Sequence, residues 1–273
     1  MEYIRLMKYP GAKKVMLGEI QEIYKKSKRT NFIDVFGGSG SVSLNIQSKY
    51  TVYNDLNPEL CALFMSIQER PENIYFLMKE GVKCRRQLIA DGSLRLNQID
   101  EEATLTIKKA ARDHGIPEKD VNAVLFLTKM NLSFGGMGGT YATRKEKASM
   151  AYISKTLDQF ESIGGNVKKW KIENLDFRDL VKKYDGTEAF FYFDPPYLGA
   201  NWYDMNFDLG DFHDLANILS GIDGKYLMTI DPESSHIQEI FGEPDYIREF
   251  KNENGPEEGL TNPPRRRAFY VRI

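Results

Sequence analysis

The sequence predicts an α/β protein built on a mostly parallel sheet, and two observations carry this prediction. Short apolar runs rich in β-forming residues end in loops at residues 32–36, 51–53, 189–193, 226–230 and 268–273. Between several of them the apolar residues have helical spacing, as at Phe212, Leu215, Ala216 and Leu219. Strands that alternate with helices indicate a sheet covered by helices on both faces. Residues 170–172 are a weaker strand candidate.

Residues 60–163 follow a different pattern. They are largely helical in spacing, show no strand–helix alternation, and contain the glycine-rich loop at residues 135–139. We therefore expect an insertion at 60–163 between two parts of one α/β domain, residues 1–59 and 164–273. Residues 251–264 carry Gly, Asn, Pro and Glu without periodicity, which predicts a loop before the last strand.

Composition and charge narrow the class of protein. The chain has 273 residues, of which 41% are hydrophobic, and a net charge of −2, which disfavours a protein coated with positive charge. The two cysteines, Cys61 and Cys84, have no metal-ligand spacing, so we expect inert thiols and no metal. No signal-like start and no run of about 18 apolar residues occurs, and we expect a cytoplasmic protein with no membrane partner.

A glycine turn follows the first predicted strand. Gly37, Gly38 and Gly40 lead into a helix expected to begin near Ser41, and such a turn lets backbone N–H groups approach an electron-rich ligand. The third glycine of a dinucleotide motif is replaced by Ser43, which weakens a nicotinamide interpretation without removing it. Asp55 ends the second strand, where a carboxylate can accept both ribose hydroxyls. The pattern predicts an adenosine-containing cofactor; the alternative is a set of loop or cap carboxylates.

The most informative motif is the tetrad Asp194, Pro195, Pro196 and Tyr197, directly after the apolar run 189–193. The two prolines stop the strand and remove two N–H groups. The Asp194 carboxylate and the Pro195 carbonyl are then acceptors suited to the two hydrogens of an exocyclic amine, and Tyr197 offers a face for stacking a planar base. The alternative is a plain strand-ending turn with Tyr197 packed on the surface.

With these motifs the sequence resembles the Dam-type DNA adenine-N6 methyltransferases (D12 class, alpha group). The resemblance rests on Lys8-Tyr9-Pro10-Gly11-Ala12-Lys13, the segment from Asp34 to Gly40, Asp55, and the tetrad. It implies a Rossmann-like, S-adenosylmethionine-dependent methyltransferase sheet, with residues 60–163 as an inserted, mostly helical target-recognition domain. In this family an acidic residue followed by Phe contacts the cofactor's adenine, and Asp176-Phe177 fits that place.

The resemblance also implies the site residues. The cofactor contacts would be Tyr9, Lys13, Asp34, Phe36, Gly37, Gly38, Ser39, Gly40, Ser41, Asp55, Asp176, Phe177 and Asp194. The substrate contacts on DNA would be Lys8, Asn131, Arg144, Lys145, Arg265, Arg266 and Arg267, of which the last five come from basic clusters. Residues 131–136 match the family's active-site loop only in part, and a plain glycine loop is the alternative.

The expected activity is site-specific methylation of N6 of a flipped-out adenine in double-stranded DNA. Cytosine-N4 methylation and a catalytically silent DNA-binding relative remain alternatives. Cytosine-C5 chemistry needs a Pro-Cys nucleophile, whereas Cys61 follows Leu60 and Cys84 follows Lys83. Enzymes acting on RNA or protein glutamine more often carry N-P-P-Y. The expected partners include a companion restriction endonuclease, and we expect a monomer, with a weak dimer as the alternative. The recognition sequence cannot be read from the chain.

Overall fold

The computed structural model describes residues 2–9, 11, 13–92, 96–133, 146–196, 207–232, 235–250 and 265–273. Contacts between residues divide the chain into two compact units. The helical unit comprises Met1–Lys14, Gly38–Asn45 and Asn57–Asn174, and the sheet unit comprises Val15–Gly37, Ile46–Leu56 and Leu175–Ile273. Each unit is described separately.

The strands form a seven-stranded sheet in the order β3-β2-β1-β4-β5-β7-β6. The strands are β1 (Asn31–Asp34), β2 (Tyr50–Asn54), β3 (Trp170–Glu173), β4 (Ala189–Phe193), β5 (Lys225–Ile230), β6 (Tyr246–Phe250) and β7 (Arg265–Arg272). The pairs β1–β2, β1–β4 and β4–β5 are parallel, whereas β7 is antiparallel to both β5 and β6. The predicted α/β class with a mostly parallel sheet is confirmed.

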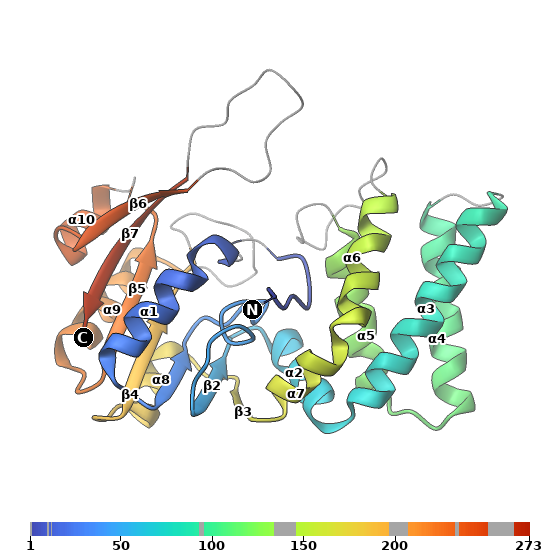
Figure 1. The fold of residues 1–273 in the computed structure, drawn as a ribbon, viewed down its shortest axis with the longest axis horizontal. Helices are drawn as coiled ribbons and strands as arrows, with labels where there is room; N and C mark the ends of the chain where they lie inside the picture. Colours follow the sequence, from blue (N-terminus) through green and yellow to red (C-terminus); the bar gives the residue numbers. More distant parts are fainter. Residues whose placement is uncertain are drawn as a thin grey trace, which may run out of the picture. The chain divides into compact units, whose positions relative to one another are not determined.

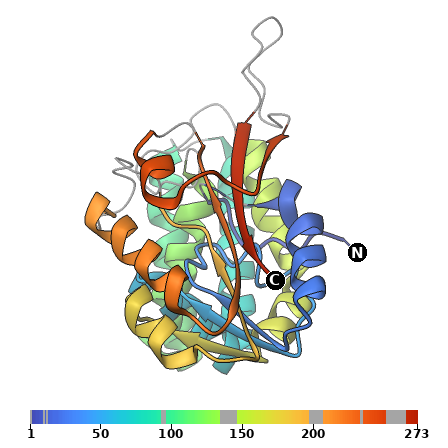
Figure 2. The same ribbon diagram turned by 90° about the vertical axis from the view of Figure 1, so that its left-hand side faces the viewer.

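Helices cover both faces of the sheet in the sheet unit (Figure 2). On one face Tyr24 of α1 (Leu17–Ser27) packs against Phe32 and Phe190, with ring centroids 5.2 and 5.3 Å apart. On the other face α8 (Phe177–Tyr184), α9 (Leu209–Gly221) and α10 (Ser235–Phe241) contribute to one apolar cluster with the strands. Successive strand residues such as Phe32 and Ile33 face opposite sides, as the two-residue period of a strand requires.

The helical unit holds α2 (Pro58–Glu69), α3 (Pro71–Asp91), α4 (Leu96–Asp113), α5 (Glu118–Leu132), α6 (Glu146–Asp158) and α7 (Phe160–Val167). The helices α3 and α4 lie side by side (Figure 1). Gly81 permits this packing, because a Cβ there would lie 2.9 Å from Ile107 Cδ1. The fully buried Asp120 carboxylate accepts hydrogen bonds from Arg70 at 2.7 and 2.8 Å. Buried charge in this unit therefore serves helix packing.

Two sequence expectations differ from the structure. The helix expected near Ser41 is a short turn, in which Leu44 N–H bonds Gly40 O at 2.8 Å and Asn45 N–H bonds Val42 O at 2.9 Å. Asn45 ends it, because its side chain bonds the backbone of Ile4 on both the N–H and the C=O. The strand β6 was not expected, since its residues are only half-buried and its sequence is not continuously apolar.

Among the residues described, none of the helices combines the length and apolar character needed to cross a membrane. Cys61 is buried and donates to Glu173 O at 3.1 Å, while Cys84 is half-buried and accepts a bond from Thr106. Neither cysteine forms a disulfide bond, and both lie in the helical unit.

Candidate active site

Four acidic side chains end four neighbouring strands of the sheet unit. Asp34 is the last residue of β1, and Asp55, Asp194 and Asp231 directly follow β2, β4 and β5. Asp34 pairs in register with Tyr53 on one side and Tyr192 on the other. Since these strands are parallel, all four carboxylates lie at the same edge of the sheet, which we call the carboxyl edge. Asp55 and Asp194 are two strands apart, or about 10 Å.

The strand order places this edge at a topological switch point. The chain goes from β1 to β2 on one side, and β4 and then β5 lie on the other side of β1. In doubly wound sheets, ligands bind outside the carboxyl ends of the strands where the order reverses. Asp34, Asp55 and Asp194 surround that position.

The Asp194 carboxylate is oriented by a chain of hydroxyl groups. Thr229 Oγ1 on β5 donates to Asp194 Oδ1 at 3.3 Å and lies 3.0 Å from the Tyr192 hydroxyl. A threonine hydroxyl has one hydrogen, so when it donates to Asp194 the Tyr192 hydroxyl must donate to it. Thr229 is fully buried, and Pro195 and Pro196 stiffen the backbone that follows Asp194.

Gly37 begins the glycine turn in a space that admits no side chain. Its N–H donates to Asn54 O at 2.7 Å, and a Cβ at this position would lie 2.3 Å from Tyr53 Cε2. The Asn54 side chain donates to Val35 O and Leu175 O at 2.9 and 3.1 Å and accepts from Leu175 N–H at 2.9 Å. Asn54 thus fixes the loop after β1 and the residue before Asp176 to the end of β2.

Aromatic rings gather beside this loop. The ring centroids of Phe36, Phe177 and Phe207 lie 5.6 to 5.8 Å from one another. Asp176 caps the N-terminus of α8 by accepting from Arg178 N–H at 2.9 Å. The predicted cofactor residues Phe36 and Phe177 are therefore in contact, with the Asp176 carboxylate next in the chain.

Other predicted cofactor residues lie in the helical unit, where the turn continues after Gly37. The Tyr9 ring packs against Gly38, whose Cβ would lie 3.0 Å from Tyr9 Cε1. Lys13 is buried; its Nζ donates to Gly11 O at 2.7 Å, and its N–H donates to Ser41 Oγ at 3.4 Å.

The turn itself is tightly packed. Gly40 has a φ of +69°, which favours glycine, and a Cβ there would lie 2.7 Å from Phe64 Cζ. Ser39 and Ser41 on either side of it are buried.

The N-terminal segment and Asn131 are joined in the same unit. The buried Asn131 accepts from Lys8 N–H at 3.1 Å and donates to Leu6 O at 3.5 Å. Lys8 Nζ lies 4.4 Å from the Tyr152 ring centroid, and Arg5 lies at the same distance from that ring. Asn131 therefore holds the backbone from which the Lys8 side chain extends.

The three arginines of the predicted basic cluster begin β7. Ile230 pairs in register with Ala268, which places Arg267 level with Asp231 at the carboxyl edge. Arg267 is largely buried; its guanidinium lies 3.5 Å from Asp231 Oδ2 and donates to Arg266 O at 2.6 Å. Arg266 is partly exposed and lies 3.7 Å from Glu249. Arg265 pairs with Phe250 on β6.

Three predicted site residues lie outside the described residues: Tyr197 of the tetrad, and Arg144 and Lys145 of the basic cluster. The glycine-rich loop at 135–139 lies outside them as well.

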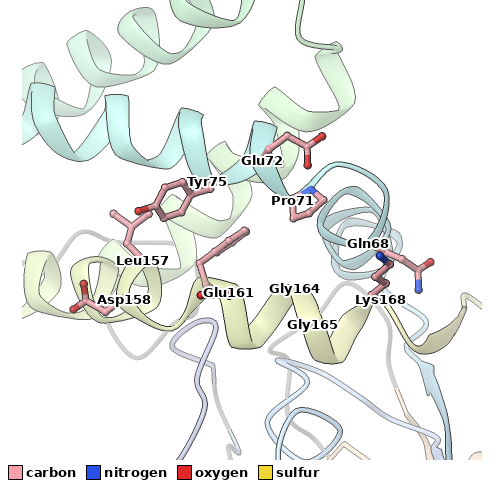
Figure 3. A pocket seen from close by; sticks show the side chains of 11 residues that line it. Gln68, Pro71, Glu72, Tyr75, Leu157, Asp158, Glu161, Gly164, Gly165 and Lys168 are labelled. Atoms are coloured by element: carbon pink, nitrogen blue, oxygen red, sulfur yellow. The ribbon is translucent and has the colours of Figure 1, made fainter.

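A groove of about 570 Å³ opens in the helical unit between the start of α3 and α7 (Figure 3). Tyr75 and Phe160 contribute aromatic rings to it, with centroids 5.7 Å apart. Its lining residues are Gln68, Pro71, Glu72, Tyr75, Leu157, Asp158, Phe160, Glu161, Gly164, Gly165 and Lys168. None of the predicted cofactor or DNA residues is among them.

Sequence reasoning missed four residues that shape the site. Thr229 is a polar residue inside an apolar strand, a signal that could have been noticed, and Asn54 adjoins the predicted Asp55. Arg178 and Phe207 carry no local signal, because their roles depend on contacts with residues more than 25 positions away.

A doubly wound sheet with a glycine turn after β1 and acids at its carboxyl edge defines an α/β protein with a Rossmann-like fold. The model of the D12 class N6 adenine-specific DNA methyltransferases matches residues 9–252. The chain belongs to this family, and the family resemblance seen in the sequence is confirmed.

Two curated relatives agree with this assignment. A type II methyltransferase, M1.LlaDCHI, of Lactococcus lactis subsp. cremoris is 26% identical over 197 residues, covering 70% of this chain and 64% of the relative. The modification methylase StsI of Streptococcus sanguinis is 22% identical over 204 residues, covering 70% of this chain and 28% of the relative. The match therefore spans less than two thirds of either relative.

Proposed function

We propose that the protein transfers a methyl group from S-adenosylmethionine to N6 of adenine in double-stranded DNA, at a specific site. The observation that carries this proposal is the Asp194 carboxylate at the end of β4, oriented by Thr229 and followed by two prolines. Membership in the D12 class supports adenine as the target and S-adenosylmethionine as the cofactor.

The residues of the sheet unit suit the adenosine part of this cofactor. Asp55, at the end of β2, would accept the ribose hydroxyls. Gly37 leaves no room for a side chain where the loop meets β2, so the backbone there stays close to the sheet. Phe36 and Phe177 supply apolar ring surface for adenine, and the Asp176 carboxylate would accept from its amine. The proposed cofactor contacts are completed by Tyr9, Lys13, Asp34, Gly38, Ser39, Gly40, Ser41 and Asp194.

The chemistry assigned to the chain is positioning and hydrogen bonding. S-adenosylmethionine, when bound, supplies an electrophilic methyl group. Asp194 and the Pro195 carbonyl would accept hydrogen bonds from the two N6 hydrogens and turn the nitrogen lone pair out of conjugation with the ring. The N6–methyl bond would form as the bond from the cofactor's sulfur to that methyl group breaks, which leaves S-adenosylhomocysteine, and the proton then lost from N6 would pass to the Asp194 carboxylate or to water. Directed acceptors of this kind act without a covalent intermediate. Thr229 keeps the acceptor in place before the base arrives, which lowers the reorganisation that the reaction requires.

The target base must leave the helix stack to reach Asp194, at a cost of a few kcal/mol. Tyr197 is proposed to stack on the flipped base, which would recover about 1–3 kcal/mol. Replacement of Tyr197 by Ala should slow methylation of duplex DNA, and an unchanged rate would show that the ring does not stack the base.

Residues 60–163 are proposed to read the target sequence, since the remaining parts of the chain supply the sheet. Lys8, Arg144, Lys145 and Arg265 to Arg267 are the proposed DNA contacts. The exposed side chain of Arg266 supports this for the β7 cluster, whereas Arg267 is largely buried beside Asp231 and supports it less. Asn131 would act through the Lys8 backbone, because its amide is buried there. We also propose that the protein is a monomer and that it has a companion restriction endonuclease.

The test is to incubate the protein with methyl-labelled S-adenosylmethionine and mixed-sequence DNA, digest the DNA to nucleosides and identify the labelled base. The proposal predicts that the label appears in N6-methyl-2′-deoxyadenosine. Label in N4-methylcytosine would show instead that the enzyme methylates the exocyclic amine of cytosine. DNA binding without label transfer, under conditions in which the cofactor binds, would indicate a silent relative.

A further inference from the structure

Arg178, in the first turn of α8, joins two separate parts of the sheet unit. Its Nη1 donates to both carboxylate oxygens of Asp176 at 3.2 and 3.1 Å. Its Nη2 donates to Asp211 at 2.5 Å, and its Nε donates to Asp214 at 2.8 Å, both on α9. One guanidinium thus connects the start of α8 with the start of α9.

Asp211 carries this connection into the N-terminal cap of α9. Its Oδ1 accepts from Arg178, while its Oδ2 accepts from Asp208 N–H at 2.9 Å. Asp208 in turn accepts from Asp211 N–H at 3.0 Å, which completes a reciprocal capping box. The two oxygens of one carboxylate therefore hold Arg178 and the first residue of the helix cap.

Aromatic contacts also connect the start of α8 with the start of α9. The Arg178 guanidinium lies 4.3 Å from the Phe177 ring centroid. Phe207, which precedes the α9 cap, contacts Phe36 and Phe177 at 5.6 Å and Phe212 at 4.7 Å. The residues that begin α9 therefore pack on the same rings that are proposed to receive the cofactor's adenine.

The charges explain why Arg178 is needed. Asp176, Asp211 and Asp214 would repel one another without a cation between them. Burial alone would lower the pKa of Arg178, but its hydrogen bonds to Asp211, Asp214 and Asp176 outweigh this and raise the pKa above its ordinary value. The Arg178 cation is therefore present at every working pH, and it fixes the Asp176 carboxylate in one orientation.

We propose that Arg178 is a positioning residue that couples cofactor binding at Asp176 and Phe177 to the N-terminal cap of α9. The inference rests on the proposed function, because that function assigns the adenine contact to Asp176 and Phe177.

Coupling of this kind is reciprocal: whatever the cofactor adds to the stability of the α9 cap, the cap adds to cofactor affinity. The test uses S-adenosylhomocysteine, which binds without turnover, and two readouts. Calorimetric titration gives its affinity, and hydrogen exchange of peptides covering residues 207–216 reports the α9 cap with and without it. Thermal unfolding of each variant verifies that it is folded.

Arg178→Gln should weaken binding about tenfold and remove the slowing of exchange that the wild-type cap shows at saturating S-adenosylhomocysteine. Arg178→Lys should restore part of both effects, because lysine keeps the charge but not the guanidinium fork. Asp214→Asn is the matched control: it removes the negative charge of one partner of the same guanidinium outside the capping box, and should leave both readouts within about twofold of wild type.

The coupling is wrong if Arg178→Gln binds S-adenosylhomocysteine as tightly as wild type and if binding still slows hydrogen exchange in its α9 cap. Equal losses in Arg178→Gln and Asp214→Asn would also overturn it, since they would indicate a general effect of charge. Should Arg178→Gln fail to fold, Asp211→Asn gives the answer: asparagine has one acceptor oxygen where Asp211 uses two, for Arg178 and for Asp208 N–H, so the proposal predicts the same two losses in this variant. A wild-type protein that does not bind S-adenosylhomocysteine would contradict the proposed function instead.

Discussion

Asp194, at the carboxyl edge of the sheet unit, and Asp120, in the core of the helical unit, are two carboxylates held by different means. Asp194 receives a hydrogen bond from a threonine hydroxyl, whereas Asp120 receives two from a guanidinium. A hydroxyl orients a carboxylate without cancelling its charge, while a guanidinium neutralises it. The first arrangement suits an acceptor that works on a substrate. The second suits a carboxylate that joins helices.

The largest effect on stability should come from the helical unit. Asp120→Ala leaves the Arg70 cation without its buried partner and should lower the free energy of unfolding by about 3 kcal/mol. Asp55→Ala, at the carboxyl edge, should leave unfolding unchanged and weaken cofactor binding about tenfold. Urea unfolding and calorimetric titration measure the two effects. Equal destabilisation by both would remove the distinction between the regions.

Gly37 in the sheet unit and Gly81 in the helical unit allow the two regions to be compared by adding a Cβ to each. A Cβ at Gly37 meets the Tyr53 ring and also the Asn54 carbonyl at 2.9 Å, and backbone cannot move aside. Gly37→Ala should cost about 2–3 kcal/mol and weaken cofactor binding. At Gly81 the Cβ meets the flexible end of Ile107, and alanine gains about 1 kcal/mol of helix propensity. Gly81→Ala should therefore lie near wild type in thermal unfolding, and a larger loss there than at Gly37 would contradict the packing described.

The hydroxyl chain gives a smaller effect on catalysis. Thr229→Val keeps the shape of the side chain but loses the bond to Asp194, and should slow methyl transfer about tenfold, equivalent to about 1.4 kcal/mol. Thr229→Ser retains the hydroxyl and serves as the control. Single-turnover rates measure both variants. Equal rates for valine and wild type would show that Asp194 needs no orienting donor.

Acid should weaken the helical unit by the smallest amount. Burial raises the pKa of Asp120, but hydrogen bonds from Arg70 and Asn73 outweigh this, so the pKa in the folded protein lies below its usual value. A folded-state pKa below the unfolded one gives stability that is complete above the unfolded pKa, about 4, and is lost as pH falls through the folded pKa. Unfolding midpoints at pH 6 and 3.5 should differ less in Asp120→Asn. An identical difference in wild type and Asp120→Asn would show that another group causes the acid sensitivity.

The strands that carry the site were predictable because each is an apolar run ended by a turn residue. Ala189–Phe193 followed by Asp194 and Pro195 is the clearest case. The chemistry at the strand ends could be inferred for the same reason, since parallel strands bring successive loops to one edge. The edge strand β6 could not be recognised, because Tyr246–Phe250 does not alternate between apolar and polar residues and none of its residues is buried.

Sequence reasoning failed where contacts between distant residues decide the outcome. The turn after Gly40 does not become a helix because Asn45 bonds the backbone of Ile4, 41 residues away. Thr229 gains its role from Asp194, 35 positions distant, and Arg178 from Asp211, 33 positions distant. No local pattern records such pairs, which arise only when the sheet brings its strands together.

The central claim is that Asp194 acts on the target amine and, although it is also among the proposed cofactor contacts, contributes little to cofactor affinity. Replacement of Asp194 by Ala, measured by single-turnover methyl transfer and by S-adenosylhomocysteine titration, tests it most directly. The prediction is a loss of about a thousandfold in transfer rate, with affinity for S-adenosylhomocysteine within about twofold of wild type. Full transfer activity in this variant, or a loss explained by failed cofactor binding, would contradict the account.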